Sequence, residues 1–115
     1  MSNKEILQQA NEAVSAGDYE DFLSVCTEDT EWTFIGERVL QGKEAVRQYM
    51  ASTYHTPPQF MVENLIEEGD FVTAVGKISL EDEDGIATHY AYCDVWQFRE
   101  GKMAKLKAFV IEELR

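Results

Sequence analysis

A segment near the C-terminus places one carboxylate in a row of aromatic side chains. Every second position of this segment carries a member of the row: Tyr90, Tyr92, Asp94, Trp96 and Phe98. Because successive side chains of a strand point to opposite faces, the five would share one face. An ionised carboxylate among aromatic rings is costly to bury, so the site must be wet, supply a partner or keep the acid protonated. Each of these outcomes describes a binding site.

Asp94 is the candidate catalytic residue, and two roles are open to it. Desolvation beside Tyr92 and Trp96 would favour its acid form, which could donate a hydrogen bond to a substrate carbonyl. It could instead accept hydrogen bonds from tyrosine hydroxyls or an indole N–H and act only in holding the fold. The functional role predicts an acid or an oxyanion donor.

Other aromatic side chains could complete a pocket for a flat or cyclic apolar ligand, or could fill an ordinary core. His55 precedes two prolines, and a histidine pKa close to neutrality suits acid or base chemistry, although this side chain could equally be exposed and idle. The candidate ligand-binding residues are Trp32, Phe34, Tyr54, His55, Tyr90, Tyr92 and Trp96.

Composition excludes several classes of function. The 115 residues include 22 acidic and 10 basic side chains, a net charge of −12 that repels nucleic acid and anionic membrane surfaces. No segment approaches the ~18 apolar residues of a membrane span. Two separated histidines and the lack of a glycine-rich phosphate loop give no support to a metal or a cofactor. The polar start favours a cytoplasmic protein, in which two cysteines act as small buried hydrophobes.

The first half of the chain predicts three helices and a strand. Ser2 and Glu5 form a capping box for the first helix, and Asp18 caps a short second one. A third helix follows Gly42 and stops before the prolines. Between the second and third helices, residues 30–35 alternate in the manner of a strand.

The second half predicts long strands over residues 60–67, 71–80, 86–98 and 103–112. Their short connections favour antiparallel pairing into a meander, and helices followed by strands make an α+β domain covering residues 1–115. At about 3.3 Å per residue the last two strands span roughly 35–40 Å, enough for a strongly curved sheet to wrap around the helices.

The last strands also carry apolar groups on the face that points away from Asp94. These groups are Ala91, Cys93, Val95, Phe109 and Ile111. An apolar face that is not covered by helices needs another cover, and a second copy of the same sheet is the simplest one. We therefore predict a homodimer formed through the β-sheet.

Several motifs of this chain occur together in one known superfamily. They are Ala16-Gly17-Asp18 after the first helix, the strand with Trp32, Gly42-Lys43-Glu44-Ala45-Val46, and the segment from Asp94 to Met103. In this combination the chain resembles the nuclear transport factor 2-like superfamily, and within it the SnoaL-like branch. The resemblance implies a cystatin-like cone, made of a curved antiparallel sheet around three helices, with a pocket at its open end. Such cones host isomerases, cyclases, epoxide hydrolases, dehydratases and transport factors.

The resemblance to ketosteroid isomerase, a relative in this superfamily, is incomplete. Asp94 falls where that enzyme keeps a protonated aspartate in its oxyanion hole. The general-base aspartate falls near Phe34 and the oxyanion-hole tyrosine near Ala10. The histidine–aspartate pair of aldol-type cyclases is also not evident, because its region reads Ala108-Phe109-Val110-Ile111. We do not expect a ketosteroid isomerase of the usual kind.

Two functions are therefore compared below. The first is binding of a small apolar cyclic molecule, with cofactor-free acid/base chemistry of isomerase, cyclase or dehydratase type if the protein is an enzyme. The alternative is a non-catalytic ligand-binding or protein-interaction module. An open pocket above ~300 Å³ that exposes the Asp94 carboxylate favours the first. A collapsed cone with Asp94 bonded only to protein groups favours the second.

Overall fold

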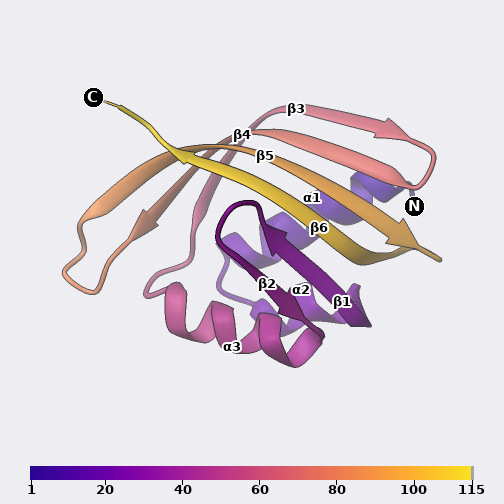
Figure 1. Ribbon diagram of the computed structural model, residues 1–115, viewed down its shortest axis with the longest axis horizontal. Helices are drawn as coiled ribbons and strands as arrows, with labels where there is room; N and C mark the ends of the chain where they lie inside the picture. The colour runs from indigo at the N-terminus through magenta and orange to yellow at the C-terminus, as the bar shows by residue number, and fades with distance from the viewer. Residues whose placement is uncertain (115) are drawn as a thin grey trace.

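The computed structural model describes residues 1–114, which form three helices and one six-stranded sheet (Figure 1). The helices are α1 (Asn3–Ser15), α2 (Tyr19–Ser24) and α3 (Lys43–Thr53). The strands are β1 (Cys26–Phe34), β2 (Arg38–Gln41), β3 (Gln59–Glu68), β4 (Phe71–Glu81), β5 (Ala87–Arg99) and β6 (Lys102–Glu112). This arrangement confirms the predicted α+β class with three helices in the first half of the chain.

Short-range hydrogen bonds begin the first two helices where the sequence predicts them. The Ser2 hydroxyl accepts from the Glu5 N–H at 3.2 Å, and the Glu5 carboxylate accepts from the Ser2 N–H at 3.1 Å. At the start of α2 the Asp18 carboxylate accepts from the Asp21 N–H at 3.1 Å. Between α1 and α2 the chain turns at Gly17, whose φ of +83° lies in the left-handed region that glycine adopts without strain.

The sheet has the order β2-β1-β6-β5-β4-β3 and contains the predicted meander. Strands β3 to β6 pair antiparallel in sequence order. Strand β1 instead runs parallel to β6, so the sheet is mixed and not purely antiparallel. In addition, β1 begins at Cys26, four residues before the predicted strand, because an irregular stretch between Cys26 and Glu31 still follows β6. The short edge strand β2 has no apolar alternation and was not predicted.

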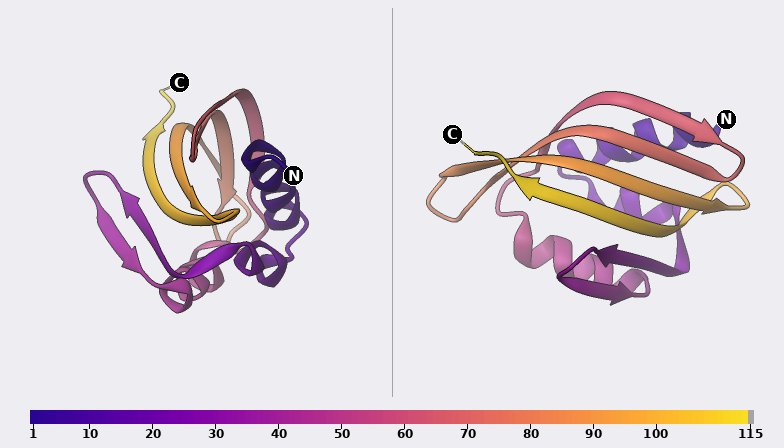
Figure 2. Two further views of the ribbon diagram at one scale, coloured as in Figure 1. Left: turned by 90° about the vertical axis from the view of Figure 1, so that its right-hand side faces the viewer. Right: turned by 45° about the horizontal axis from the view of Figure 1, so that its top comes forward.

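The long strands curl into a concave surface that the helices close (Figure 2). Helix α1 packs against β3 and β4, whereas α3 packs against β1 and β2. Between the helices and the sheet lies the core, whose most completely buried hydrophobic side chains include Leu7, Leu23, Val46, Met50, Val72 and Met103. Both cysteines are free; Cys26 is buried and Cys93 is half-buried. None of the helices within residues 1–114 has the length and apolar character of a membrane span.

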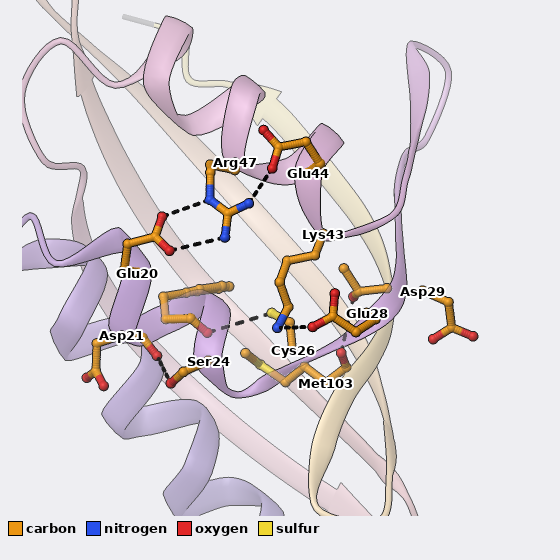
Figure 3. Close-up of polar contacts among 12 residues, drawn as sticks. Glu20, Asp21, Ser24, Cys26, Glu28, Asp29, Lys43, Glu44, Arg47 and Met103 are labelled. Atoms are coloured by element: carbon orange, nitrogen blue, oxygen red, sulfur yellow. Dashed lines mark hydrogen bonds and ion pairs between the residues drawn. The ribbon is translucent and has the colours of Figure 1, made fainter.

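Polar side chains join the helices to one another and to β1 (Figure 3). Arg47 on α3 donates from Nε to Glu20 of α2 at 2.8 Å and also pairs with Glu44 of its own helix. Lys43 at the start of α3 lies 3.2 Å from the Glu28 carboxylate of β1. Exposed ion pairs contribute about 0–1 kcal/mol each, so these contacts orient α2 and α3 more than they stabilise the fold.

Candidate ligand pocket

The aromatic face predicted for β5 lines a cavity on the concave side of the sheet. Tyr90, Tyr92, Asp94 and Trp96 all border this cavity, whose volume is about 290 Å³. Phe98, the fifth member of the predicted row, lies deeper in the core with 2% of its surface exposed. It follows a register shift between β5 and β6 at Gln97, and it does not border the cavity.

The remaining walls of the pocket come from all three helices and from β1, β3, β4 and β6. Trp32 and Phe34 of β1 and Tyr54 at the end of α3 line it, as the sequence predicts. His55 is exposed and does not line it, because the chain bends away after Tyr54 toward Pro57. The structure thus brings seven of the eight predicted site residues together, and His55 is the one it leaves outside.

Asp94 lies between two alanines of the neighbouring strands. The strand register pairs it with Ala74 of β4 and with Ala108 of β6, which are 1% and 2% exposed. These small side chains leave the space in front of the carboxyl open to the cavity. No hydrogen bond or charge within residues 1–114 offsets the burial, and desolvation raises the pKa of the Asp94 carboxyl to about 7.

Two further polar groups of the pocket are buried without a partner. The Trp32 Nε1 and the Tyr92 hydroxyl make no hydrogen bond with any group in residues 1–114. A buried donor that lacks a partner costs about 1–3 kcal/mol, and native proteins contain few of them. Because both atoms are fully buried, they lie within the wall of the pocket and not on its open surface.

Burial holds the hydroxyls of three pocket tyrosines, Tyr49, Tyr54 and Tyr92, in their neutral form. Burial is the main cause that raises the pKa of Tyr92 to about 12, and the negative charge of the nearby Asp94 carboxylate adds to it. Burial also raises the pKa of Tyr49 and, far more strongly, that of Tyr54. No Lys, Arg or His among residues 1–114 lines the pocket. Its interior chemistry is therefore that of the Asp94 carboxyl with neutral hydrogen-bonding groups around it, because the second lining carboxylate, Glu37, is 63% exposed.

Edge-to-face contacts hold the Trp32 ring in place at the pocket wall. Its centroid lies 5.8 Å from that of Trp96 with an interplanar angle of 84°, and 5.6 Å from that of Phe22 at 89°. Such geometry is favourable for aromatic pairs. Trp32 and Trp96 are each only 4% exposed, so these rings belong to the core and to the pocket wall at once.

Sequence reasoning did not identify three of the residues that shape the pocket. Tyr49 of α3 lines it, and its inward place on the helix was the available signal. Ala108 lies beside Asp94 only through the strand register, which the sequence pattern does not fix. Glu37, in the turn between β1 and β2, lines the pocket with a side chain that is 63% exposed and lies 3.2 Å from Arg38.

A larger hollow of about 960 Å³ lies between α1 and β3. It is open and mainly polar, with walls that include the exposed side chains of Gln8, Gln9, Glu63 and Asn64. It contains none of the buried polar groups without partners. We therefore place the candidate site in the smaller pocket, which encloses Asp94.

Comparison with known proteins agrees with this architecture. The model of the SnoaL-like domain matches residues 7–106. No curated protein matches the sequence. The fold is similar to that of SalBIII, an epoxide hydrolase/cyclase-like enzyme with a role in pyran ring formation in the polyether salinomycin (22% identity, 94% of this chain and 89% of that chain, TM-score 0.86).

Two further solved structures have the same fold. One is a putative SnoaL-like polyketide cyclase from Jannaschia sp. CCS1, at 15% identity over 94% of this chain and 84% of that chain, with a TM-score of 0.82. The other is TerC co-crystallised with polyporic acid, at 19% identity over 93% of this chain and 89% of that chain, with a TM-score of 0.79. From the domain match and the cone that surrounds Asp94, this chain belongs to the SnoaL-like family of the nuclear transport factor 2-like superfamily.

Proposed function

We propose that this protein binds a small, largely apolar cyclic molecule in its cone and transforms it by cofactor-free acid/base chemistry. The observation that carries the proposal is the Asp94 carboxyl, which faces an aromatic-walled cavity and has a pKa of about 7. At neutral pH such a group is present in both its acid and its carboxylate forms. A pKa near the working pH is the property that a general acid or base requires.

In this proposal Asp94 acts as the acid. Its protonated form donates a hydrogen bond to a substrate carbonyl or epoxide oxygen and stabilises the negative charge that develops there. The apolar walls keep water away and strengthen this interaction. Isomerisation, cyclisation and dehydration all need such a donor. The fold shared with a cyclase-like enzyme and with a protein crystallised with a cyclic ligand supports the same class of molecule.

The cavity of about 290 Å³ lies just below the ~300 Å³ that we set for an open ligand pocket. The state of the Asp94 carboxyl favours the binding function more clearly than the cavity volume does. In a purely structural network Asp94 would be bonded to protein groups, but its pKa is raised by desolvation alone. This favours a ligand site over a closed interaction module.

A thermal-shift screen of flat apolar ring compounds tests the proposal. A compound that binds the native state at a hundred times its Kd raises the free energy of unfolding by about 2.7 kcal/mol. We expect such a compound to stabilise the wild type more than Asp94→Asn, and not to stabilise Ala108→Leu, whose longer side chain fills the space beside Asp94. If no compound shifts the wild-type melting temperature, the proposed function is wrong.

The proposal includes a homodimer formed through the convex face of the sheet. The strand register places Phe109 beside Cys93, and Ile111 beside Ala91 on this face. The rings and aliphatic chains there are well exposed, with Phe109 at 42% and Ile111 at 70%. A contiguous apolar face of this kind favours association with a second copy.

A further inference from the structure

The convex face of β6 carries a graded row of side chains. Because side chains alternate along a strand, every second residue from Lys105 to Glu113, which directly follows the strand, points away from the pocket. The row has two basic residues at its start, apolar residues in the middle and an acid at its end: Lys105, Lys107, Phe109, Ile111 and Glu113. Such a row is complementary to a second copy of itself that runs in the opposite direction.

The neighbouring strands add one more polar group at each end of this row. Beside Lys105 lies Glu31 of β1, its partner in the strand register. Beside Glu113 lies His89 of β5, whose carbonyl oxygen accepts from the Glu113 N–H at 2.9 Å. The Ser79 hydroxyl lies 2.8 Å from His89 Nδ1, so Nε2 remains for another partner. Each end of the face therefore presents one acid and one base.

These side chains retain capacity for contacts outside the protomer. Neither Lys105 nor Glu31 forms an ion pair within residues 1–114, although the Gln41 amide donates to the Glu31 carboxylate. Lys77 lies 3.2 Å from Oε1 of Glu113, and the second oxygen of that carboxylate can accept from another cation.

We propose that the partner of this face is a second copy of the chain, related by a two-fold axis that passes through Phe109 at right angles to the sheet. This inference rests on the homodimer of the proposed function and deepens it by assigning the register of the two sheets. The rotation places Lys105 opposite Glu113 of the second copy, and Glu31 opposite His89 of the second copy. Symmetry repeats each contact, so both occur twice in one dimer.

The dimensions of the sheet fit this arrangement. Lys105 and Glu113 lie at equal separations in the sequence from Phe109, about 13 Å along the strand at 3.3 Å per residue. Two aligned sheets pack about 10 Å apart with their strands crossing at about 30°. At about 13 Å from the axis this crossing shifts opposed residues by about 7 Å, a gap that a lysine and a glutamate side chain span together.

The same rotation covers an exposed apolar side chain that does not line the pocket. Ile35 continues β1 beside β6, where its N–H donates to the Ala108 carbonyl at 3.0 Å, and it is 47% exposed. Cys93 lies beside Phe109 on the other side, in β5. A two-fold axis through Phe109 exchanges these flanking strands, so Ile35 of one copy packs against Cys93 of the other.

Two other axes bring like charges together. An axis through Cys93, one strand further into the sheet, places Lys107 opposite Lys77 of the second copy. An axis midway between β5 and β6 places Lys105 opposite His89 of the second copy. Like charges that face each other across an interface disfavour that arrangement. The charges of this chain therefore favour the proposed axis.

Charge reversal tests the register, with the dissociation constant of the dimer from analytical ultracentrifugation at low salt as the readout. Lys105→Glu sets two acids against each other at both ends of the dimer, and its dissociation constant should rise at least about tenfold. Adding Glu113→Lys to the same chain restores unlike charges, and the double variant should return to within about threefold of wild type. Lys4→Glu on α1 makes the same change in net charge away from this face, and should change the constant less than about twofold.

Two further variants give independent measurements. His89→Glu places an acid opposite Glu31 and should weaken the dimer, so it tests the register even if Lys105→Glu fails to fold. Lys107→Glu separates the proposed axis from the one through Cys93. In the proposed dimer it removes the aliphatic stem that covers Ile111 of the second copy, and the dimer weakens. Around Cys93 the new acid pairs with a lysine, and the dimer tightens.

The outcomes distinguish the register from the dimer itself. Melting temperatures show which variants are folded. A double variant that stays as weak as Lys105→Glu alone, or a tighter dimer for Lys107→Glu, overturns the register and leaves the dimer intact. A wild type that is monomeric at every concentration removes both the register and the proposed dimer. Ligand binding in the cone is tested separately by the thermal-shift screen.

Discussion

Desolvation of the Asp94 carboxyl couples the pocket to the stability of the fold. Its pKa is about 7 in the folded protein, compared with an ordinary value of 3.8. Between these two values the folded state holds more protons than the unfolded state, so the free energy of unfolding decreases as the pH rises through this window. The stabilisation that comes with the protonated Asp94 carboxyl is fully present below pH 4 and is lost as the pH rises through about 7. Its full size is roughly 4 kcal/mol.

Asp94→Asn should remove this dependence, because the amide has nearly the same shape and does not ionise. We expect the stability of the variant relative to wild type to increase by roughly 2–3 kcal/mol between pH 5 and pH 8. Urea denaturation of both proteins at the two pH values measures this difference, and all other titrating groups cancel in the comparison. A difference that is the same at both pH values would show that Asp94 keeps an ordinary pKa.

Alternation along β5 was sufficient to predict that Asp94 and its aromatic neighbours share one face, because a strand has a strict period of two. The raised pKa was harder to predict. It depends on desolvation of the carboxyl, and the strands that flank Asp94 on both sides are brought there only by the tertiary fold. His55 was misplaced because the direction of the chain after Tyr54 depends on tertiary packing, which no local pattern encodes.

At the scale of the elements, strand β4 approaches β3 so closely that one position needs a glycine. A Cβ atom on Gly76 would lie 2.2 Å from the Met61 carbonyl oxygen, next to the irregularity at Val62 in β3. Gly76 is also the partner of Tyr92 on β5. The close approach of β3 therefore helps to set the place of a pocket residue, since the Phe60 ring of β3 lies 6.1 Å from that of Tyr92.

Gly76→Ala should destabilise the protein by roughly 2–3 kcal/mol, because backbone atoms must move to make room for the methyl group. For a domain of this size the melting temperature should fall by about 10 °C. Gly101→Ala is the matched control: its φ of +76° costs about 1 kcal/mol, but nothing lies within 4 Å of the new atom. Calorimetry compares the two variants, and an equal loss in both would refute the clash at Gly76.

Capping residues, turns and strand periodicity predicted all the helices and the four long strands. The parallel pairing of β1 with β6 was not predictable in this way, because it joins segments that are far apart in the chain. Local signals determine where an element begins. They do not determine which distant strand becomes its neighbour.

At the scale of the whole molecule, the two faces of the sheet differ: one borders the pocket and the other exposes apolar side chains. Its concave face forms the pocket, and its convex face exposes Met61 on β3 together with Phe109 and Ile111 on β6. The sequence suggested this division, since both faces of β5 and β6 carry apolar side chains. A pocket closed by helices on one side leaves the apolar convex side uncovered, and this uncovered face is the basis of the proposed dimer.

Phe109→Asp should weaken the proposed dimer, because it places a charge at the centre of the apolar convex face. We expect wild-type protein to sediment at twice the protomer mass at micromolar concentration and the variant to sediment as a monomer. Ile86→Asp is the control, since Ile86 is 62% exposed but lies outside the strands. Analytical ultracentrifugation over a range of concentrations separates the three proteins. A wild type that stays monomeric would exclude the dimer.

The surroundings of Asp94 depend on one unpaired residue near the turn between β5 and β6. Near the turn, Phe98 is the partner of Met103, but Gln97 is the partner of Lys105, so Ala104 has no partner of its own. If β6 kept the register of Phe98 and Met103 along its whole length, with Ala104 paired, Lys107 would lie opposite Asp94. An ammonium group beside the acid would neutralise it, and a permanent ion pair would occupy the cavity floor. The unpaired position of Ala104 thus keeps Lys107 on the exposed side of β6 and away from Asp94.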